Sequence, residues 1–242
     1  MTSPSARRSA RAGSLRKGPT TRARIVDDAI RLVSVEGLSA LTIGRLAERT
    51  GMSKSGLFAH FESRESVELA VLDEAIARFR DAVILPSLRE PRGEPRVRAL
   101  VERWHAWEND HATMPGGCLL LQSAVELDDR PGRSRELVAG AMQQWAETLR
   151  RAAAIAIEEG HFRADLDPAL FAFQVQGIIL AAHHTERLLR LPGAAARVSK
   201  ALDALIEWAR PHPVAKPAKP AKPATAARPR RGTPAAARLR KK

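Results

Sequence analysis

Apolar residues recur every three or four positions over most of residues 21–210, which is the spacing of helices that bury one face. The first such segment covers Thr21–Glu36. A long segment begins at Ser63 and carries an apolar strip as far as Val83. Pro86 and the two prolines after it then predict a break in the helix.

The second half of the chain continues the helical pattern. Asp167 followed by Pro168 is typical of a helix start, with a capping side chain and a first-turn proline. The helix that they open is predicted to end at Pro192-Gly193. No stretch shows convincing strand-like alternation, so we predict an all-α fold. The apolar stripe of the helix after Pro168 consists of Leu170, Phe173, Gly177, Ala181, His184 and Leu188.

Residues 41–65 predict two short helices joined by a tight turn. Thr42 can cap the first helix, and Gly51 stands where the chain must reverse, a position that favours positive φ. Ser53 can cap the second helix, in which Leu57 points back to the core. Two helices joined by a short turn that contains glycine form the DNA-reading helix-turn-helix, whose second helix enters the major groove.

This segment closely resembles the TetR/AcrR family of transcriptional regulators. The extension after the second helix, from His60 to Glu65, separates it from a generic helix-turn-helix. The resemblance implies a three-helix DNA-binding domain followed by a helical ligand-binding and dimerisation domain. It also implies a ligand-released repressor that binds a palindromic operator as a homodimer. The matching residues are Gly37-Leu38, Leu41-Thr42, Leu46-Ala47, Gly51, Ser53, Gly56-Leu57, His60-Phe61 and Ser63-Arg64-Glu65.

Charge divides the chain into a body and two arms. The formal net charge is +13, yet all 27 acidic residues lie within 25–210, where they outnumber the basic ones. Such acid-free, basic ends are typical of disordered interaction tails. We therefore predict a disordered basic arm over 1–20, a helix-turn-helix domain over 21–66, an effector-binding and dimerisation domain over 67–210, and a disordered Lys/Pro/Ala tail over 211–242.

The basic tail leaves an alternative open. Residues 215–223 repeat Ala-Lys-Pro three times, which favours an extended polyproline II chain with a lysine on each turn. This composition resembles the tails of histone-like proteins. A nucleoid-type protein that coats DNA without strong sequence preference therefore stands beside the sequence-specific regulator.

Double-stranded DNA is the partner that the helix-turn-helix predicts. Lys54 and Ser55 begin the second helix and can reach base edges, whereas His60 and Arg64 match positions that usually contact phosphates. Phe58 stands where the family usually has tyrosine, so it cannot donate to a phosphate. We expect the basic arms to add electrostatic affinity. The predicted DNA-binding residues are Thr42, Arg45, Ser53, Lys54, Ser55, Gly56, Phe58, His60 and Arg64.

The family resemblance also implies a small-molecule effector, although aromatic residues at helical spacing are often plain core. The last two helices match the place where family members dimerise, and Ala181 and Ala182 suit a close approach of helices. An effector-binding helical enzyme is a further alternative, with only the aromatic residues in its favour. The candidate effector-binding residues are Trp104, Trp107, Met142, Trp145, Phe171 and Phe173.

Several other classes have no sequence support. The single Cys118 excludes an intramolecular disulfide and fits a reducing cytoplasm, and the chain lacks a transmembrane run of 18 apolar residues. His183 and His184 point about 100° apart on a helix, which argues against a metal site. The common catalytic and nucleotide-binding motifs are missing. We expect a bacterial, cytoplasmic, nucleoid-associated regulator that needs no cofactor or metal and does not contact membranes.

Overall fold

The computed structural model describes residues 21–211, and all the regular secondary structure in that range is helical. The predicted arm over 1–20 and all but the first residue of the predicted tail lie outside it. The all-α prediction is confirmed. The first half comprises α1 (Thr21–Glu36), η1 (Leu38–Ala40), α2 (Ile43–Thr50), α3 (Lys54–Phe58) and α4 (Arg64–Phe79).

The second half contains the longer helices, several of which follow the predicted segments closely. Asp167 caps α9 as predicted, because its carboxylate accepts from the backbone N–H groups of Ala169 and Leu170. The elements are η2 (Arg80–Ile84), α5 (Leu85–Ser87), α6 (Glu94–Glu108), α7 (Leu119–Leu127), α8 (Arg133–Glu158), α9 (Pro168–His183), η3 (His184–Leu188) and α10 (Ala194–Ala209).

The helix that begins after Ser63 runs further than predicted. A π-helical turn, η2, follows α4 and leads directly into α5, so Pro86 lies inside the helical segment rather than breaking it. Pro86 occupies the first turn of α5, where its missing N–H is tolerated. The Ser87 hydroxyl donates to the Val83 carbonyl at 2.7 Å, which satisfies one backbone acceptor of this turn. A π-helical turn, η3, likewise continues α9 as far as Leu188, four residues before Pro192, where the helix was predicted to end.

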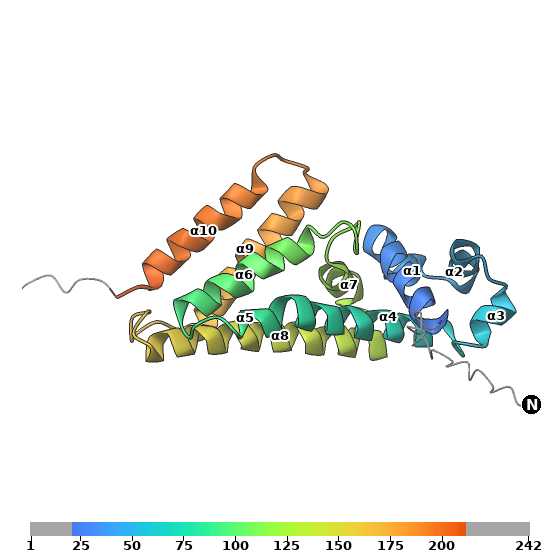
Figure 1. Ribbon diagram of the computed structural model, residues 1–242, viewed down its shortest axis with the longest axis horizontal. Coiled ribbons are helices and arrows are strands. Elements are labelled where there is room, and N and C mark those ends of the chain that lie inside the picture. Colours follow the sequence, from blue (N-terminus) through green and yellow to red (C-terminus); the bar gives the residue numbers. More distant parts are fainter. Residues whose placement is uncertain (1–20, 212–242) are drawn as a thin grey trace, which may run out of the picture. The chain divides into compact units, whose positions relative to one another are not determined.

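Two long helices, α4 and α8, lie side by side along the lower edge of the view in Figure 1. Helix α9 packs on α8, and α10 packs on α9 and α6. Helix α1 contacts α2, α4 and α7, so it connects the helix-turn-helix with the rest of the protein. Residues 21–211 form one compact unit, and the domain boundary after residue 66 stays a prediction.

The stripe predicted along α9 lies on its exposed side. Phe173 is 71% exposed and Leu170 is 45% exposed, and Gly177 and Ala181 of the same stripe are also exposed. Periodicity alone did not show which side of the helix is covered, because α9 is apolar around most of its circumference. The side of α9 that faces the core carries Phe171, Ala172, Val175, Ile179 and Ala182.

Candidate DNA interface and effector cavity

The turn between α2 and α3 has the geometry that the sequence predicts. Gly51 ends α2 in the left-handed region, with φ 67° and ψ 21°. The Thr42 hydroxyl caps α2 by accepting from Arg45 N–H at 3.2 Å, and the Ser53 hydroxyl caps α3 by accepting from Gly56 N–H at 3.0 Å. Buried Leu57 anchors α3 to the core. These local contacts fix how α3 is presented to a partner.

The side chains at the start of α3 are exposed, and the Ser55 hydroxyl shares a 3.0 Å hydrogen bond with that of Ser53. Lys54, Ser55 and His60 are exposed, and Phe58 is 50% exposed. A half-exposed phenylalanine on this helix can contact sugar or base surfaces without donating a hydrogen bond. Gly56 is half-buried, and a Cβ there would lie 3.2 Å from the Ser53 hydroxyl oxygen. Glycine at this position therefore protects the cap of α3.

Two of the predicted DNA-binding residues, both arginines, already have partners inside the protein. Arg45 forms an ion pair with Glu36 at 2.5 Å. Arg64 pairs with Glu68 at 2.7 Å, and its guanidinium also reaches the Leu38 carbonyl at 3.5 Å. Both arginines would have to share or exchange these partners to bind phosphate. Their predicted DNA contacts are not tested by this geometry.

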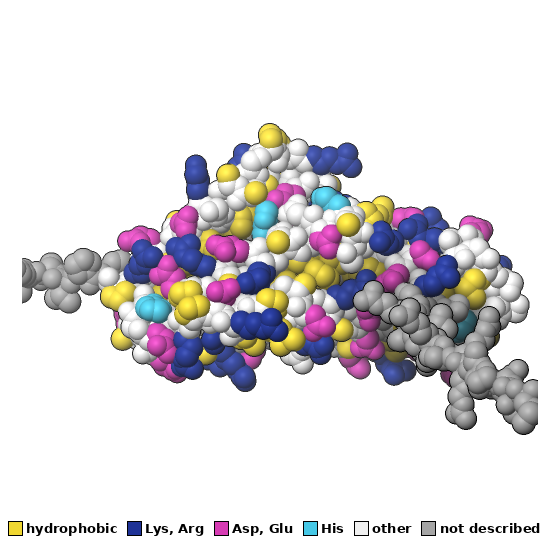
Figure 2. All heavy atoms as spheres, in the orientation of Figure 1, with side chains coloured by type: hydrophobic (Ala, Val, Ile, Leu, Met, Phe, Trp, Pro, Cys, Tyr) yellow, Lys and Arg dark blue, Asp and Glu magenta, His cyan; other side chains and the backbone are white. Residues whose placement is uncertain are grey.

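Sequence reasoning missed one cation near the recognition unit. The Arg22 guanidinium at the start of α1 lies 4.7 Å from the centre of the buried Phe61 ring, a cation–π contact. Such a pair joins two segments far apart in sequence and has no local signal. On the face in Figure 2, basic and acidic side chains are interleaved over the described residues.

An apolar cavity of about 190 Å³ lies among α4, η2, α6, α7 and α8. Trp104, Met142 and Trp145 line it, which brings together three of the six predicted effector residues. Phe79 also lines it and meets the Trp145 ring edge-on, with centroids 5.2 Å apart. Sequence reasoning placed Phe79 in the core strip of α4 and missed its place in the cavity wall. Ile76, Arg80, Ile84, Cys118, Leu120, Leu121, Ala141 and Gln144 complete the lining.

The other three predicted effector residues lie elsewhere. Trp107 is buried behind the cavity wall, 6.1 Å from Phe79 between ring centroids. Phe171 is buried against Phe162, with centroids 5.1 Å apart, and belongs to the core. Phe173 lies on the exposed side of α9. These three residues therefore do not belong to the cavity that Trp104 lines.

Cys118 is buried in the wall of this cavity. Burial, and secondarily the charge of Glu108, raises the pKa of its thiol to about 11. The thiol is therefore protonated at neutral pH, and it adds a weakly polar surface rather than a nucleophile.

The carboxylate of one α7 residue links this helix to η1, the turn that precedes the helix-turn-helix. Glu126 accepts from the backbone N–H groups of Leu38 and Ser39, both at 2.7 Å, and from the Ser39 hydroxyl. Burial raises the pKa of Glu126, but the hydrogen bonds from Ser39 and Leu38 outweigh it and hold the pKa below its ordinary value. We call this set of contacts the α7–η1 junction.

A second junction lies at the other end of α7. The amide of Gln122 donates to the carbonyls of Ser34 and Gly116, at 2.9 and 2.7 Å. Gly116 N–H in turn donates to the Ser34 hydroxyl at 3.2 Å. A Cβ on Gly116 would lie 1.4 Å from the Ser34 carbonyl oxygen, so the two backbones are in direct contact. Helix α7 is thus attached to the last turn of α1 and to η1.

Two histidine–carboxylate pairs connect α6 with α9 and η3. His105 Nε2 lies 2.9 Å from Glu186 Oε1, and His183 Nδ1 lies 2.6 Å from the buried Glu108 carboxylate. Glu108 also accepts from Cys118 N–H at 2.8 Å. No short-range pattern in the sequence indicated these distant partners. Over residues 21–211, His, Cys, Asp and Glu side chains form no group of three that suits a metal ion.

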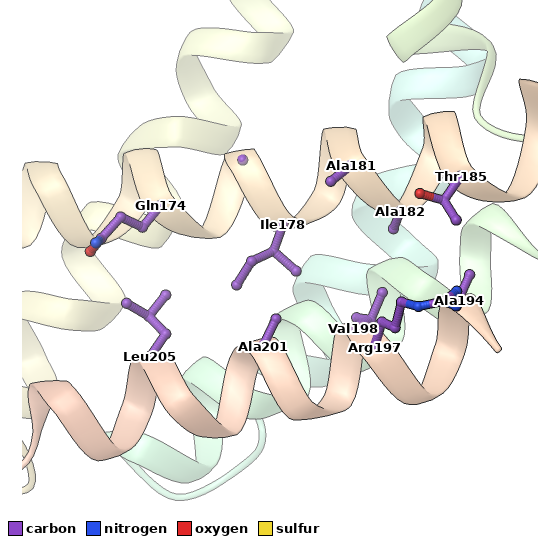
Figure 3. A pocket seen from close by; sticks show the side chains of 11 residues that line it. Gln174, Ile178, Ala181, Ala182, Thr185, Ala194, Arg197, Val198, Ala201 and Leu205 are labelled. Carbon is purple, nitrogen blue, oxygen red and sulfur yellow. The ribbon is translucent and has the colours of Figure 1, made fainter. Parts of the chain in front are cut away.

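An open groove of about 480 Å³ lies between α9 and α10 (Figure 3). Ile178 and Ala181 of α9 face Val198, Ala201 and Leu205 of α10 across it. The wall is largely apolar, and most of its side chains are small. Together with the exposed stripe of α9 it forms an extended apolar surface, which we call the α9–α10 face.

The comparisons with known proteins identify the family. The family model described as "Bacterial regulatory proteins, tetR family" matches residues 25–71, and "Tetracyclin repressor-like, C-terminal domain" matches residues 93–202. The chain is 30% identical over 161 residues to the HTH-type transcriptional repressor KstR2 of Mycobacterium tuberculosis, which covers 60% of this chain and 71% of KstR2. The chain belongs to the TetR family. It is therefore a DNA-binding transcriptional regulator, in a family of regulators rather than enzymes.

Further relatives of this TetR-family regulator agree. The HTH-type transcriptional repressor AcnR of Corynebacterium glutamicum is 34% identical over 67 residues, 28% of this chain and 36% of AcnR. A TetR transcriptional regulator from Chloroflexus aurantiacus has a TM-score of 0.68 at 26% identity, covering 77% of this chain and 92% of that one. The structure of AibR with isovaleryl coenzyme A and operator DNA shares the fold, with a TM-score of 0.61, 18% identity and coverage of 77% and 96%. These relatives lend no support to the DNA-coating alternative.

The helices of this regulator differ from membrane-spanning helices in length or in polarity. None of those within residues 21–211 has both the length and the apolar character to span a membrane.

Proposed function

We propose that this TetR-family regulator is a repressor that binds a palindromic operator as a homodimer and leaves it when a small effector fills the cavity. The observation that carries the proposal is the position of α7. Its residues Leu120 and Leu121 line the cavity, while Glu126 on the same helix holds the turn before the helix-turn-helix. A ligand that displaces α7 therefore acts on the DNA-reading unit.

The DNA contacts in this proposal start from α3. Lys54 and Ser55 supply base-edge contacts in the major groove, and His60 and Thr42 contact phosphates. Phe58 adds an apolar contact with the backbone or bases. Arg45 and Arg64 act after exchanging their present carboxylate partners for phosphate, so their contribution is smaller than that of a free arginine. Gly56 and Ser53 position α3 rather than read bases.

The homodimer in this proposal forms through the α9–α10 face. An exposed Phe173, 71% accessible, and an open groove lined by small residues suit a second copy of the same two helices. Gln174 supports this arrangement because its side-chain oxygen is shielded and lacks a hydrogen-bond partner among the described residues. Sedimentation of F173E tests the dimer, with L88E as a control at an exposed leucine outside this face. We expect F173E to be a monomer and L88E to remain a dimer.

Release of DNA by the effector follows from competition between two arrangements of the two helix-turn-helix units in the dimer. Ligand and DNA each favour one arrangement, so each weakens the affinity for the other by the same factor. In the dimer the spacing of the two α3 helices sets which operator fits. The cavity and the α7–η1 junction share one helix, so a displacement of Leu121 is transmitted to Leu38 through Glu126.

Mapping of DNA occupancy across the genome tests the whole proposal. The full-length protein at physiological salt should occupy a few sharp sites with twofold symmetry, and the protein without residues 211–242 should occupy the same sites. Broad occupancy that disappears with the tail would instead support the DNA-coating alternative. A triple change K54A, S55A, F58A serves as the control, because it should abolish sharp sites while leaving the tail intact.

A further inference from the structure

The charge of the cavity wall indicates what kind of molecule it accepts. Among the described residues that line the cavity, Arg80 alone is charged, so the lining contains no carboxylate. The remaining polar groups are the Gln144 amide and the Cys118 thiol, which is neutral because its pKa is raised to about 11. A cationic ligand would thus meet a like charge in the wall, because the nearby carboxylates of Asp81 and Glu108 lie outside the lining and already face Arg80 and His183.

The Arg80 guanidinium is available to a ligand. It pairs with Asp81, its neighbour in sequence, at 2.8 Å, and the two side chains are 57% and 59% exposed. An ion pair this exposed is weak, so an incoming anion can share or replace Asp81 at small cost. The guanidinium presents several N–H donors in a planar fork that matches a carboxylate.

The backbone around Arg80 is itself unusual. Arg80 begins the π-helical turn η2, and Ile84 at its end also lines the cavity. Single π-helical turns within α-helices are rare and are frequent at functional sites. Here the turn brings a cation and an apolar side chain to the same cavity from consecutive turns of one helix.

The size of the cavity limits the apolar part of the ligand. Its volume of about 190 Å³ is somewhat larger than the roughly 150 Å³ of an engineered cavity that binds benzene. It therefore holds an apolar group of about six to eight non-hydrogen atoms. Trp104, Trp145 and Phe79 enclose that group, and a polar end remains near the rim at Arg80.

We propose that the effector is a small amphiphilic anion, a carboxylate on a short hydrocarbon or aromatic body, with its apolar end among Trp104, Trp145 and Phe79 and its carboxylate on Arg80. This inference rests on the proposed function, in which this cavity is the effector site. It adds the class of ligand, which nothing in the family resemblance supplies. The Gln144 amide, which makes no side-chain hydrogen bond within the described residues, is a second donor for the same carboxylate.

Binding of three probes that share a chain of six carbons tests the class of ligand. Hexanoate, hexan-1-ol and hexyltrimethylammonium are titrated into the full-length protein at pH 7, with tryptophan fluorescence and calorimetry as readouts. We expect hexanoate to bind about 5- to 10-fold more tightly than hexanol, and the ammonium ion most weakly. Equal binding of hexanoate and hexanol, tighter binding of the ammonium ion, or binding of none of the three overturns the inference.

Two variants assign the preference to Arg80. R80Q removes the cation at the rim, and R89Q removes an exposed arginine that does not line the cavity. R80Q should bind hexanoate and hexanol equally, while R89Q keeps the preference of the native protein. Retention of the preference in R80Q contradicts the inference even if hexanoate binds.

Release of operator DNA separates this inference from the proposed function. Hexanoate binding that depends on Arg80 but leaves the DNA complex intact would contradict effector release and support the ligand class. Release of DNA by hexanol as readily as by hexanoate would support effector release and contradict the ligand class.

Discussion

The Glu126 carboxylate accepts a hydrogen bond from Leu38 N–H at 2.7 Å, across 88 positions of sequence. The same carboxylate accepts from Ser39 N–H, so one side chain satisfies two backbone donors of the turn before α2. The turn belongs to the DNA-reading half and the carboxylate to a helix that lines the cavity. This junction therefore connects the two directly.

Replacement of Glu126 should uncouple effector from DNA. We expect E126A to lower the free energy of unfolding by about 1–3 kcal/mol, because the N–H groups of buried Leu38 and exposed Ser39 lose their acceptor. In the same variant the effector should weaken operator binding less than in the native protein. Urea unfolding and effector titrations of the operator complex measure the two effects. E102Q, a change at an exposed glutamate of α6, is the control.

The junction also makes a prediction about pH. The pKa of Glu126 lies below its ordinary value of 4.5 in the folded protein, so its contribution to stability is complete above that value. The contribution is lost as the pH falls through the folded pKa. The stability difference between native protein and E126Q should therefore shrink below about pH 4.5. A difference that does not depend on pH would contradict the ionised state of Glu126.

Gly116 should tolerate no side chain. In G116A the new Cβ would lie 1.4 Å from the Ser34 carbonyl oxygen, so α1 or the loop before α7 must move. We expect a loss of at least about 2 kcal/mol in the free energy of unfolding. G140A is a matched control in α8, where a Cβ meets no atom within 4 Å. That variant should be neutral or slightly stabilised, because alanine favours helix.

Lys54 should matter more to operator binding than Arg45. Lys54 is exposed at the start of α3, whereas Arg45 is paired with Glu36. K54A should cost about 1–3 kcal/mol of binding free energy and relax the preference for one base. K200A removes an exposed lysine of α10 as a control. Competition assays with single-base operator variants separate loss of specificity from a uniform loss of affinity.

Cys118 should be chemically inert in the folded protein. A thiol with a pKa of about 11 has roughly one thiolate in a thousand at pH 8, and its burial blocks access as well. Iodoacetamide should label the native protein at least about 100-fold more slowly than the urea-unfolded protein. Fast labelling of the native protein would contradict the burial of this thiol.

The basic arms should set the salt dependence of DNA binding. Residues 1–20 and 211–242 carry no acidic residue, and their effect can be measured although they lie outside the described residues. Removal of one phosphate-binding cation should reduce the slope of log K against log salt by about 0.9. Deletion of both arms should therefore give a clearly shallower slope. An unchanged slope would show that the folded part alone makes the ionic contacts.

Local signals in the sequence were sufficient for the recognition unit. The caps at Thr42 and Ser53 and the left-handed Gly51 depend on neighbours within a few residues, so the pattern predicted their geometry. The Glu126–Leu38 bond depends on how α7 packs on α1, and short-range patterns carry no information about it. The break predicted at Pro86 was wrong because a π-helical turn places this proline in the first turn of a new helical segment.

Three of the six predicted effector residues line the cavity, because tertiary packing decides which aromatic side chains face it. Trp104 and Trp145 were identified because the family resemblance implied an effector site and they are large aromatic residues of that region. Phe171 and Phe173 are close together in the sequence of α9, but their burial differs completely, at 0% and 71% exposed. Helical periodicity identifies the face on which a residue lies, whereas the packing partner of that face depends on tertiary structure.

Helix α4 begins beside the recognition unit at Arg64 and ends in the cavity wall at Phe79. Its 16 residues make a rod of about 24 Å. Each degree by which the cavity end is tilted moves the far end by about 0.4 Å. A rod of this length converts a small tilt at the cavity into a larger displacement at its other end. In the proposed mechanism, this is how a ligand of only a few atoms would move α3 relative to the major groove.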